Sequence, residues 1–440
     1  MRLDRLSEAS CLALLLVLLC ASITFAAPPT FTVGDEPFLC DFNDLESALD
    51  AVPDGAHIQL SVGTYVVDHL TRHESVRISG GHDGCGGAQL PGVRSILDAD
   101  KVGQILDIGA FDPIWVVLDQ LDFRNGRGTP FASSPAPASG AGLRTLGPVQ
   151  LLVDDVIFRN HRAQLGSAID LVRTDRGAAD AVIRNSRFYW NSSTSPVFGV
   201  ARGGAVACRG GQLTIRDSTF IGNFADDEGG AVYLETCDVT IVDTRFDRSR
   251  TLGRGGAIGL VESGANLFGV ISERSTANDF GSFLSAFSGA GRDVEIASSV
   301  VTQGGGGNQV FTSTDSKVRV LSSTFYDNPS AQPVLDLDDA ESHVSHVIFS
   351  GNGGPPTQQD PDVFTCNLVD GPGPVPANSQ NTVFGDPLFV AGDFHLQANA
   401  GSPAVDACPF GLYEAAVEDI DGDPRPDAEG MNDIGADEVR

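Results

Sequence analysis

Short stretches in which apolar and polar residues alternate recur along most of the chain. Examples are LTIRDSTF at 213–220 and VTIVDTRF at 239–246, both rich in β-branched residues. Period-two alternation with such residues is typical of β-strands, and the Asp in each stretch permits the left-handed backbone that ends a strand. Helical repeats would need longer segments with a period of about 3.6. We therefore expect short strands joined by sharp corners.

The same unit returns at a fixed spacing. Three Gly-Gly-Ala triplets begin 26 residues apart, and Phe220 and Phe246 keep that spacing. A glycine pair supplies unhindered backbone at a second corner of each unit. The paired glycines are Gly203 and Gly204, Gly229 and Gly230, and Gly255 and Gly256.

A Phe-x-x-Asn ending marks most of the units, although the unit around Phe246 lacks the Asn. Stacked strands lie ~4.8 Å apart, so successive coils would place these phenylalanines in one internal column. The asparagines would then form a row of side-chain amides at one corner. The pattern predicts an all-β fold, a parallel β-helix solenoid of roughly ten coils between Ala56 and Thr365. The complete pairs are Phe188 with Asn191, Phe220 with Asn223, Phe325 with Asn328, and Phe349 with Asn352.

One segment near the N-terminus has a helical pattern instead. In NDLESALDAVPDG at 43–55, Asn43 or Asp44 can cap a helix, and Pro53 can end it. The residues that share its apolar face are Leu45, Ala48, Leu49 and Val52. We expect this helix to cover the first coil, because an exposed sheet edge would pair with other chains.

The chain opens as an export signal does. Arg2 and Arg5 precede the apolar run CLALLLVLLCASITFA, which small residues follow. This order is typical of a secretory signal peptide, here cleaved near Ala26. A membrane helix is disfavoured because the run is short, and a lipoprotein because Leu19 precedes Cys20. We expect a secreted or cell-surface protein, extracellular or periplasmic, with no transmembrane segment after cleavage.

The formal net charge is −30, and Lys101 and Lys317 are the only lysines. So acidic a chain repels nucleic acid and anionic membranes, which excludes nucleic-acid binding. It favours solubility and cation binding.

Six cysteines remain after cleavage, and an even number in an exported chain indicates disulfides. Cys40 lies just before the predicted helix, and Cys85 follows an early strand and corner. We expect these two to be bonded, which would tie the cap to the stack. Cys208 and Cys237 are 29 residues apart, three out of register for coils of 26. Their pairing stays open, as does that of Cys366 and Cys408.

The repeats and the tail each resemble a known group. Gly-Gly-Ala-Val or -Ile followed by Phe-x-x-Asn resembles the repeats of polymorphic outer-membrane proteins, which are right-handed, pectin-lyase-like β-helices. The tail, GDPLFVAGDFHLQANAGSPAVDAC at 385–408 and DIDGDPRPDAEGMNDIGADE at 419–438, is similar to the choice-of-anchor Q domain of exported bacterial proteins. The resemblance implies a right-handed β-helix closed by a C-terminal module.

The resemblance also sets the expected division of the chain. Only 75 residues follow Thr365, too few for the translocator barrel that ends such outer-membrane families, and no sorting motif follows the tail. Self-anchoring is therefore not expected. The expected parts are a signal peptide (1–26), an N-terminal cap (27–55), the β-helix (56–365) and a C-terminal capping module (366–440).

Candidate catalytic residues are sparse. Polygalacturonase-like sites combine Asn-Thr-Asp, Asp-Asp, Gly-His-Gly and Arg-Ile-Lys, and only Asp-Asp occurs here, at 154–155, 226–227 and 338–339. Adjacent residues of a strand point to opposite faces, so we interpret these pairs as solvated turn charges. The nearest thing to a basic groove is Arg173, Arg176 and Arg202. We assign no catalytic residue.

No cofactor or metal is assigned either, and calcium is the one ion left open. Asp336, Asp338 and Asp339 beside Glu341 are suitable ligand types but have no identifiable partner base. His343 and His346 are three apart in a strand-like segment, which predicts opposite faces. DIDGDPRPD at 419–427 does not fit an EF-hand loop, and GGGG at 304–307 lacks the Lys-Ser/Thr of a phosphate loop.

Two functions fit this sequence. The first is a structural or adhesive β-helix that presents a stacked face to an extracellular polysaccharide or another envelope component. The second is a polysaccharide lyase or glycoside hydrolase that acts in a lateral groove. Asp, Glu and Arg converging in one groove would favour the enzyme, and a flat face with exposed aromatic rings would favour binding. The sequence assigns no oligomeric state.

Overall fold

The computed structural model describes residues 28–36, 39–128, 138–195, 201–306, 309–338, 341–391, 393–397, 401–409, 415–425 and 430–439. Within β28, it gives no side-chain detail for 288–291. The predicted signal peptide and Asp339 lie outside the described residues. No helix among the described residues has both the length and the apolar character needed to cross a bilayer.

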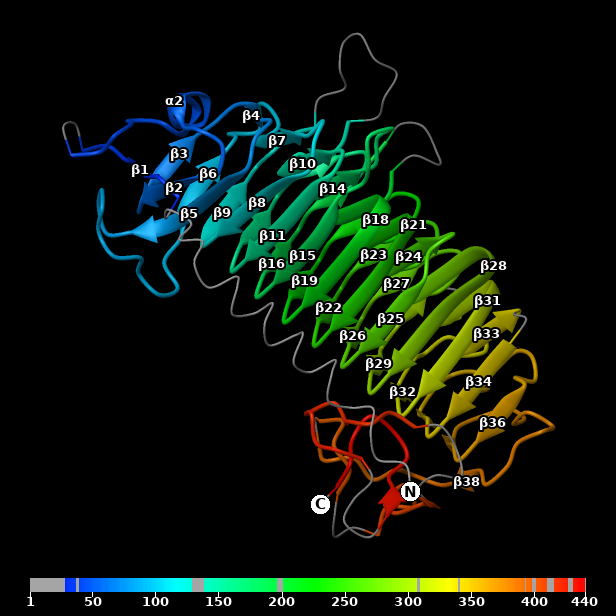
Figure 1. Ribbon diagram of the computed structural model, residues 1–440. Helices are drawn as coiled ribbons and strands as arrows, with labels where there is room; N and C mark the ends of the chain where they lie inside the picture. The colour runs from blue at the N-terminus through cyan, green and yellow to red at the C-terminus, as the bar shows by residue number, and fades with distance from the viewer. Residues whose placement is uncertain are drawn as a thin grey trace, which may run out of the picture.

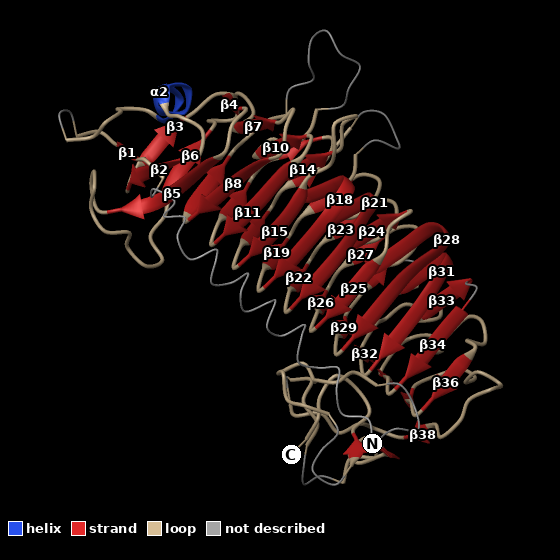
Figure 2. Cartoon of the chain, in the orientation of Figure 1, coloured by secondary structure: helices blue, strands red, loops and turns tan. Residues whose placement is uncertain are grey.

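Three long parallel sheets, named A, B and C here, run side by side along one elongated stack (Figure 1; Figure 2). The chain visits them in turn: β18 (Val206–Arg216) lies in sheet A, β19 (Thr219–Ile221) in sheet B and β20 (Phe224–Ala225) in sheet C. It then re-enters sheet A as β21 (Val232–Val242), which pairs with β18 in parallel at an offset of 26 residues, from Val206 with Val232. This register makes the fold a parallel β-helix.

Sheet A has two halves, because each coil crosses it twice. Some coils use two strands, such as β10 and β11, and others use one long bent strand, such as β18, which pairs with both β14 and β15. Its strands are β1 (Thr30–Val33), β2 (Ala56–Ser61), β4 (Leu70–Arg72), β5 (Val76–His82), β7 (Leu106–Gly109), β8 (Ile114–Asp119), β10 (Leu143–Leu146), β11 (Val149–Asp154), β14 (Ile169–Val172), β15 (Asp180–Arg184), β18, β21, β24 (Ile258–Val261), β25 (Ala265–Phe268), β28 (Leu284–Ala297), β31 (Phe311–Leu321), β33 (Leu335–Asp338), β34 (Glu341–Ser345) and β36 (Val363–Thr365).

Sheets B and C consist of much shorter strands. Sheet B contains β3 (Thr64–Val66), β6 (Ser95–Asp98), β9 (Leu121–Arg124), β12 (Ile157–Arg159), β16 (Arg187–Tyr189), β19, β22 (Arg245–Asp247), β26 (Ile271–Glu273), β29 (Val300–Thr302), β32 (Thr324–Tyr326), β35 (Ile348–Ser350), β37 (Leu368–Asp370) and β38 (Val383–Phe384). Sheet C contains β13 (Arg162–Ala163), β17 (Ser192–Ser193), β20, β23 (Arg250–Thr251), β27 (Thr276–Ala277) and β30 (Gly305–Gly306). A separate antiparallel pair, β39 (Cys408–Pro409) and β40 (Met431–Asn432), lies in the tail.

Residues with positive φ form the corners. Asp217 (49°) and Asp243 (46°) turn the chain from sheet A to sheet B, and Gly203, Gly229 and Gly255 (64–65°) return it to sheet A. The second glycine of each pair is required for a different reason, because there is no room for a side chain at that position. A Cβ on Gly204 would lie 2.0 Å from the Gly230 carbonyl oxygen, and one on Gly230 would lie 2.1 Å from that of Gly256.

A column of phenylalanine rings fills the interior behind sheet B. Neighbouring ring centroids lie 4.8, 5.2, 4.5 and 4.9 Å apart. Ser272 and Val301 interrupt the column, which resumes with Phe325 and Phe349 at 5.6 Å. The rings of the first run belong to Phe123, Phe158, Phe188, Phe220 and Phe246, all fully buried.

The asparagines form a buried amide row at the corner between sheets B and C. Asn191 N and Nδ2 both donate to Asn223 Oδ1 at 3.1 Å, and Asn223 Nδ2 donates to the Phe188 carbonyl oxygen at 3.0 Å. Asn328 and Asn352 repeat the arrangement further along the stack, with Asn328 N donating to Asn352 Oδ1 at 3.1 Å. Each amide thus satisfies backbone groups that the corner leaves without strand partners.

Helix α2 (Leu45–Ala51) lies at the N-terminal end of the stack (Figure 1). Asp44 is its N-cap, with Oδ1 accepting a hydrogen bond from Ser47 N at 2.7 Å. Its apolar side chains belong to the same buried core as the coils. The Arg72 guanidinium donates to the Leu49 and Val52 carbonyl oxygens at the C-terminal end of the helix, at 2.6 and 3.1 Å.

Three disulfides join Cys40 with Cys85, Cys208 with Cys237, and Cys366 with Cys408. Their sequence separations are 45, 29 and 42 residues. The first links the segment before α2 to the loop after β5.

The bond between Cys208 and Cys237 bridges the three-residue mismatch noted in the sequence. Cys237 lies opposite Gly211 in the ladder, not opposite Cys208. Both strands bend at this point, because Gly210 and Thr236 have positive φ values of 81° and 52°. The bend brings the two cysteine Cα atoms to 6.0 Å.

The tail packs on the last coils and runs along the corner between sheets A and B. The Gly435 N–H donates to the His346 carbonyl oxygen at 2.8 Å, and the Ala416 N–H to Ser322 Oγ at 3.0 Å. One coil before Ser322, Ser298 Oγ donates to the Glu418 carbonyl oxygen. The described tail therefore contacts the side of the stack as well as its C-terminal end.

Candidate functional site

A row of three hollows follows the outer face of the trailing half of sheet A, the half that contains β8, β11 and β15. Three hollows of about 410, 400 and 480 Å³ lie end to end there. The first two share Gln212 and Thr214, and the second and third share Asp293. We call this row of hollows the outer groove. Since it runs from β8 to β36 across parallel strands ~4.8 Å apart, it is roughly 40 Å long.

Two columns of outward side chains line the outer groove. They point outward because side chains alternate along a strand and the intervening residues, such as Val116 and Leu118, are buried in the core. From β8 onward the first column contains Val117, Leu152, Val182, Thr214, Thr240, Asn266, Glu295, Arg319 and His343. The second contains Trp115, Gln150, Asp180, Gln212 and Asp238, and further on Asp293, Lys317 and Glu341.

The chemistry of the outer groove changes along its length. The end near α2 is apolar and aromatic, the middle carries amides and hydroxyls, and the end near the tail is charged. Six acidic and three basic residues line it in all. The basic residues are paired: Arg292 with Asp238 at 3.0 Å, Lys317 with Glu341 at 2.9 Å and Arg319 with Glu295 at 3.3 Å. Hydrogen bonding to Glu341 raises the pKa of Lys317.

A second cluster of charged side chains lies on the leading half of sheet A, the half that contains β7, β10 and β14. The Arg144 Nε donates to Asp107 Oδ1 at 3.1 Å, and Arg209 pairs with Asp170 at 2.6 Å. Asp107, Arg144 and Asp170 are all buried. Burial raises the pKa of Asp170, and the charge of Arg209 opposes that rise.

The same cluster continues to the glycine corner at Glu228. Arg202 and Arg254 flank Glu228 in register from the coils on either side, and Arg202 Nε lies 3.8 Å from Glu228 Oε2. Glu228 is 7% exposed, and its Oε1 accepts no hydrogen bond from the described residues. Burial raises the pKa of Glu228, while both arginines oppose the rise. Next to it Arg202 donates to the hydroxyl of fully buried Tyr233 at 2.6 Å. We call Arg202, Glu228, Tyr233 and Arg254 the corner cluster.

The expectation that the Asp-Asp pairs are solvated turn charges is wrong for Asp227, whereas Asp154 and Asp155 are half-exposed. Asp227 is buried, and its Oδ2 accepts a hydrogen bond from Ala201 N at 2.7 Å. Asp154 pairs with Arg184 at 2.6 Å, and Asp155 pairs with Arg94. These carboxylates connect different coils, since each partner lies in another turn of the solenoid.

The arginines expected as the nearest basic cluster have separate partners. The Arg176 guanidinium lies 4.8 Å from the ring centroid of Phe111, and Arg202 contacts Tyr233. The stem of Arg173 lies beside Gly210, where an added Cβ would be 2.7 Å from its Cδ. They do not form the lining of the outer groove.

The carboxylates left open as possible calcium ligands are also held apart. The Asp336 carboxylate accepts a hydrogen bond from Gln359 at 2.9 Å on the leading half of sheet A, whereas Glu341 pairs with Lys317 in the outer groove. Asp338 is exposed at the end of β33. Asp339 lies outside the described residues.

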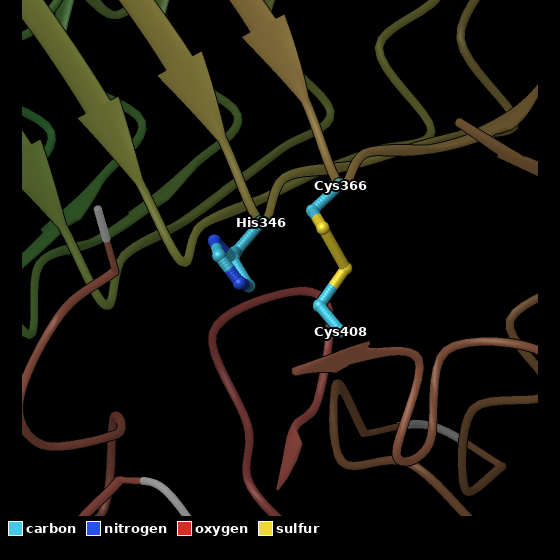
Figure 3. A group of neighbouring side chains, drawn as sticks. All are labelled: His346, Cys366 and Cys408. Atoms are coloured by element: carbon cyan, nitrogen blue, oxygen red, sulfur yellow. A yellow bond between two sulfur atoms is a disulfide. The ribbon is translucent and has the colours of Figure 1, made fainter. Parts of the chain in front are cut away.

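His343 and His346 differ because one lies in a strand and the other at a corner. His343 lines the outer groove, whereas His346 has a positive φ of 57° and is fully buried beside the tail. Figure 3 shows His346 next to Cys366 and Cys408, with ligand atoms within 4.8 Å of one another. The two sulfurs are bonded to each other, so they are not thiolates and this group is not a metal centre.

The acidic tail motif organises its own backbone. Asp419 Oδ1 accepts hydrogen bonds from Asp421 N and Asp423 N, at 2.9 and 2.7 Å. Buried Arg425 pairs with Glu438 at 3.1 Å. The Asp419 carboxylate thus serves as a backbone acceptor for the residues that follow it.

A second group of possible ligands, His395, Asp421 and Asp437, lies nearby. The two ring nitrogens of His395 already contact Asp393 and Asp421 at 2.7 Å each, and Asp437 accepts from Leu396 N at 2.7 Å. These bonds account for the arrangement without an ion.

The repeat residues singled out in the sequence all belong to the scaffold, and sequence reasoning missed the groove. The glycine pairs, the phenylalanines and the asparagines lie at corners or in the core. The residues of the two outward columns share one feature of the sequence. Each stands at an outward position of a trailing strand, two or four residues before that strand ends. Finding them would have needed an alignment of the repeats to one another.

No family model matches the sequence, and no curated protein matches it. Among solved structures, a mutant of the periplasmic alginate epimerase AlgG is 10% identical, with 78% of this chain and 83% of that chain covered and a TM-score of 0.46. A mutant of the PL6 family alginate lyase AlyGC is 12% identical, with 88% and 57% covered and a TM-score of 0.40. The GH136 lacto-N-biosidase from Eubacterium ramulus is 10% identical, with 81% and 67% covered and a TM-score of 0.38.

These likenesses are too distant to transfer an activity. The fold rests on this chain's own strand register, in which every neighbouring pair of strands in sheets A, B and C among those described is parallel. The protein is a parallel β-helix, the architecture of pectin-lyase-like proteins.

Proposed function

We propose that the protein binds an extended polysaccharide lengthwise in the outer groove. The observation that supports this most is the row of hollows across successive parallel strands, in which neighbouring hollows share lining residues. Equivalent side chains repeat there at the ~4.8 Å spacing of strands, which is about the length of one sugar ring in an extended glycan. A linear polymer can therefore make a similar contact with each coil.

The side chains in the middle of the groove suit this ligand. Thr214 and Thr240 offer hydroxyls, and Gln212 and Asn266 offer amides. Each of these groups both donates and accepts hydrogen bonds, as sugar hydroxyls do. None of the four carries a charge, so their desolvation on binding costs less than that of an ion pair.

Export fits this role. Three disulfide pairs are typical of oxidising compartments such as the periplasm or the extracellular space. We extend the proposal to a secreted or surface-attached protein in which the β-helix displays the groove. The signal peptide, the right-handed coil, and the capping role of α2 and the tail remain predictions of the sequence.

Binding to a glycan array, followed by titration with oligosaccharides of increasing length, tests the proposal. A ligand that lies along the coils gains contacts with each added ring, so affinity should rise from the disaccharide to at least the hexasaccharide. An affinity that stops rising at the disaccharide would indicate a single small pocket and would overturn lengthwise binding.

Polysaccharide cleavage, as a lyase or a glycoside hydrolase, is the second candidate function. The corner cluster favours it, because a buried carboxyl with a raised pKa between two arginines is a suitable general acid or base. The burial of Glu228 fits a structural role equally well. For that reason polysaccharide binding is the primary proposal. An assay for reducing ends and unsaturated products, with Glu228→Gln as the inactive control, distinguishes the two.

A further inference from the structure

The groove end near α2 contains an exposed tryptophan. Trp115 projects outward from β8 and is 38% exposed. By contrast, Val116 and Leu118 of the same strand are fully buried. Gly55 lies beside the ring, since a Cβ on Gly55 would be 3.8 Å from Trp115 Cζ2. The ring thus lies next to Gly55 and is partly accessible to solvent.

Polar and aliphatic groups surround this ring in an ordered way. Gln150 and Asp180 follow Trp115 in its own column, one strand apart. Leu152 and Val182 lie in the adjacent column and form an aliphatic floor. The hollow, about 410 Å³, therefore offers an aromatic face, an amide and a carboxylate on successive coils. This is the set of groups that holds a sugar ring, with the ring face on the indole and hydroxyls on the polar side chains.

The charges of the groove decide which sugars fit. Every basic side chain that lines it in the described residues is already paired with an acid. The hollow at Trp115 itself contains one charged residue, Asp180. A uronic acid would meet no free cation there, and both Asp180 and the net charge of −30 would repel it.

From these observations we infer that the outer groove takes a neutral hexopyranose polysaccharide, with one ring stacked on Trp115 and hydrogen bonded to Gln150 and Asp180. The inference rests on the proposed function and specifies its ligand class. It makes Trp115 the main anchor of the apolar end, so its loss should weaken binding roughly tenfold.

The chain contains only two tryptophans, which allows a direct optical test. Trp190 is 56% exposed and lies at the end of sheet B strand β16, away from the outer groove. The variant Trp190→Phe leaves Trp115 as the only indole, and Trp115→Phe leaves Trp190. Both are titrated with cellohexaose, mannohexaose and hexagalacturonate while tryptophan emission is recorded.

We expect a saturable emission change with at least one neutral hexasaccharide in Trp190→Phe, and none in Trp115→Phe. Hexagalacturonate should change neither. Trp115→Ala should lower the affinity for the neutral ligand about tenfold, while Trp190→Ala should leave it unchanged. Thermal unfolding of each variant confirms that the solenoid is intact.

The outcomes separate this inference from the proposed function. If hexagalacturonate binds more tightly than both neutral hexasaccharides and Thr240→Trp in mid-groove abolishes that binding, the groove still binds polysaccharide and the neutral class is wrong. If a neutral ligand changes the emission of Trp190 but not of Trp115, the subsite is wrong. If no hexasaccharide of either charge binds, both proposals fail.

Discussion

The rings of Phe188 and Phe220 stack with their centroids 4.5 Å apart and their planes 3° apart, although 32 residues separate them in the chain. They are direct register partners in sheet B, as are Phe220 and Phe246. The strand spacing of ~4.8 Å therefore sets the ring spacing. Because each ring packs on the one before and the one after, the column links the coils energetically.

Replacing Phe220 by Ala should lower the free energy of unfolding by ~3–5 kcal/mol, because the coils above and below hold the cavity open. Urea denaturation of the mature protein measures the loss. Phe224→Ala is the matched control in the same coil, since its ring is half-exposed in sheet C. Equal losses at the two positions would contradict the internal column.

Gly230 is expected to tolerate no side chain. Gly230→Ala places a Cβ 2.1 Å from the Gly256 carbonyl oxygen, and backbone cannot move aside as a flexible side chain can. The strain should cost at least ~1–3 kcal/mol. At Gly63 a Cβ would meet nothing closer than 3.9 Å, so Gly63→Ala should be nearly neutral in the same denaturation assay. A neutral Gly230→Ala would mean that the corner is looser than the structure shows.

Glu228 should make stability depend on pH in a defined direction. Burial raises its pKa above the ordinary value of 4.5, so the folded state holds a proton that the unfolded state has released. Stability should then fall as the pH rises from 4.5 through the raised pKa. Glu228→Gln removes this contribution, so the variant should become more stable relative to the wild type as the pH rises.

Thermal unfolding between about pH 4 and pH 8 measures that difference. Glu341→Gln is the control, because Glu341 is exposed and pairs with Lys317 at the surface. A gap between wild type and Glu228→Gln that stays constant with pH would show that Glu228 does not titrate in this range.

The Cys40–Cys85 bond should stabilise the N-terminal end. Its loop spans 45 residues, for which loop-closure entropy allows up to about 4 kcal/mol. Mapping of non-reduced peptides should recover Cys40 joined to Cys85, and Cys40→Ser should lower the unfolding temperature of the mature protein. Recovery of free Cys40 from the folded protein would contradict the bond.

The protein should not depolymerise pectin or polygalacturonate, with or without calcium. The basic side chains of the described groove are paired with acids, and the net charge of −30 repels polyanions. Absorbance from unsaturated uronate products, followed with calcium and with chelator, checks this. A calcium-dependent rise that chelator abolishes would favour the lyase alternative.

The sequence was sufficient for the repeating part of the fold. Phe220 and Phe246 align directly because no loop is inserted between them. The glycine pairs repeat with the same spacing and mark the equivalent corner in each coil. The period of 26 then follows from counting alone. Local chemistry also restricted the helix cap to Asn43 or Asp44, because an N-cap is recognised from adjacent residues, and the structure shows Asp44 in that position.

The groove and the buried charges could not be predicted in the same way. Arg292 pairs with Asp238 at a separation of 54 residues, and Arg94 with Asp155 at 61, so these contacts depend on how inserted loops shift the coils. The period-two pattern predicts a strand face for His346, but the strand ends at Ser345, and the ring lies at the corner, where the tail covers it. Burial of Asp227 likewise depends on the neighbouring coil.

The most direct test of polysaccharide binding is to block the groove in its middle. Thr240→Trp fills the floor between Thr214 and Asn266, whereas Thr219→Trp adds the same bulk to the outer face of sheet B. Both threonines are half-exposed in strands of neighbouring coils. Calorimetric titration with the hexasaccharide selected on the array should give wild-type affinity for Thr219→Trp and at least about a tenfold loss for Thr240→Trp. Equal affinity in the two variants would contradict binding in the outer groove.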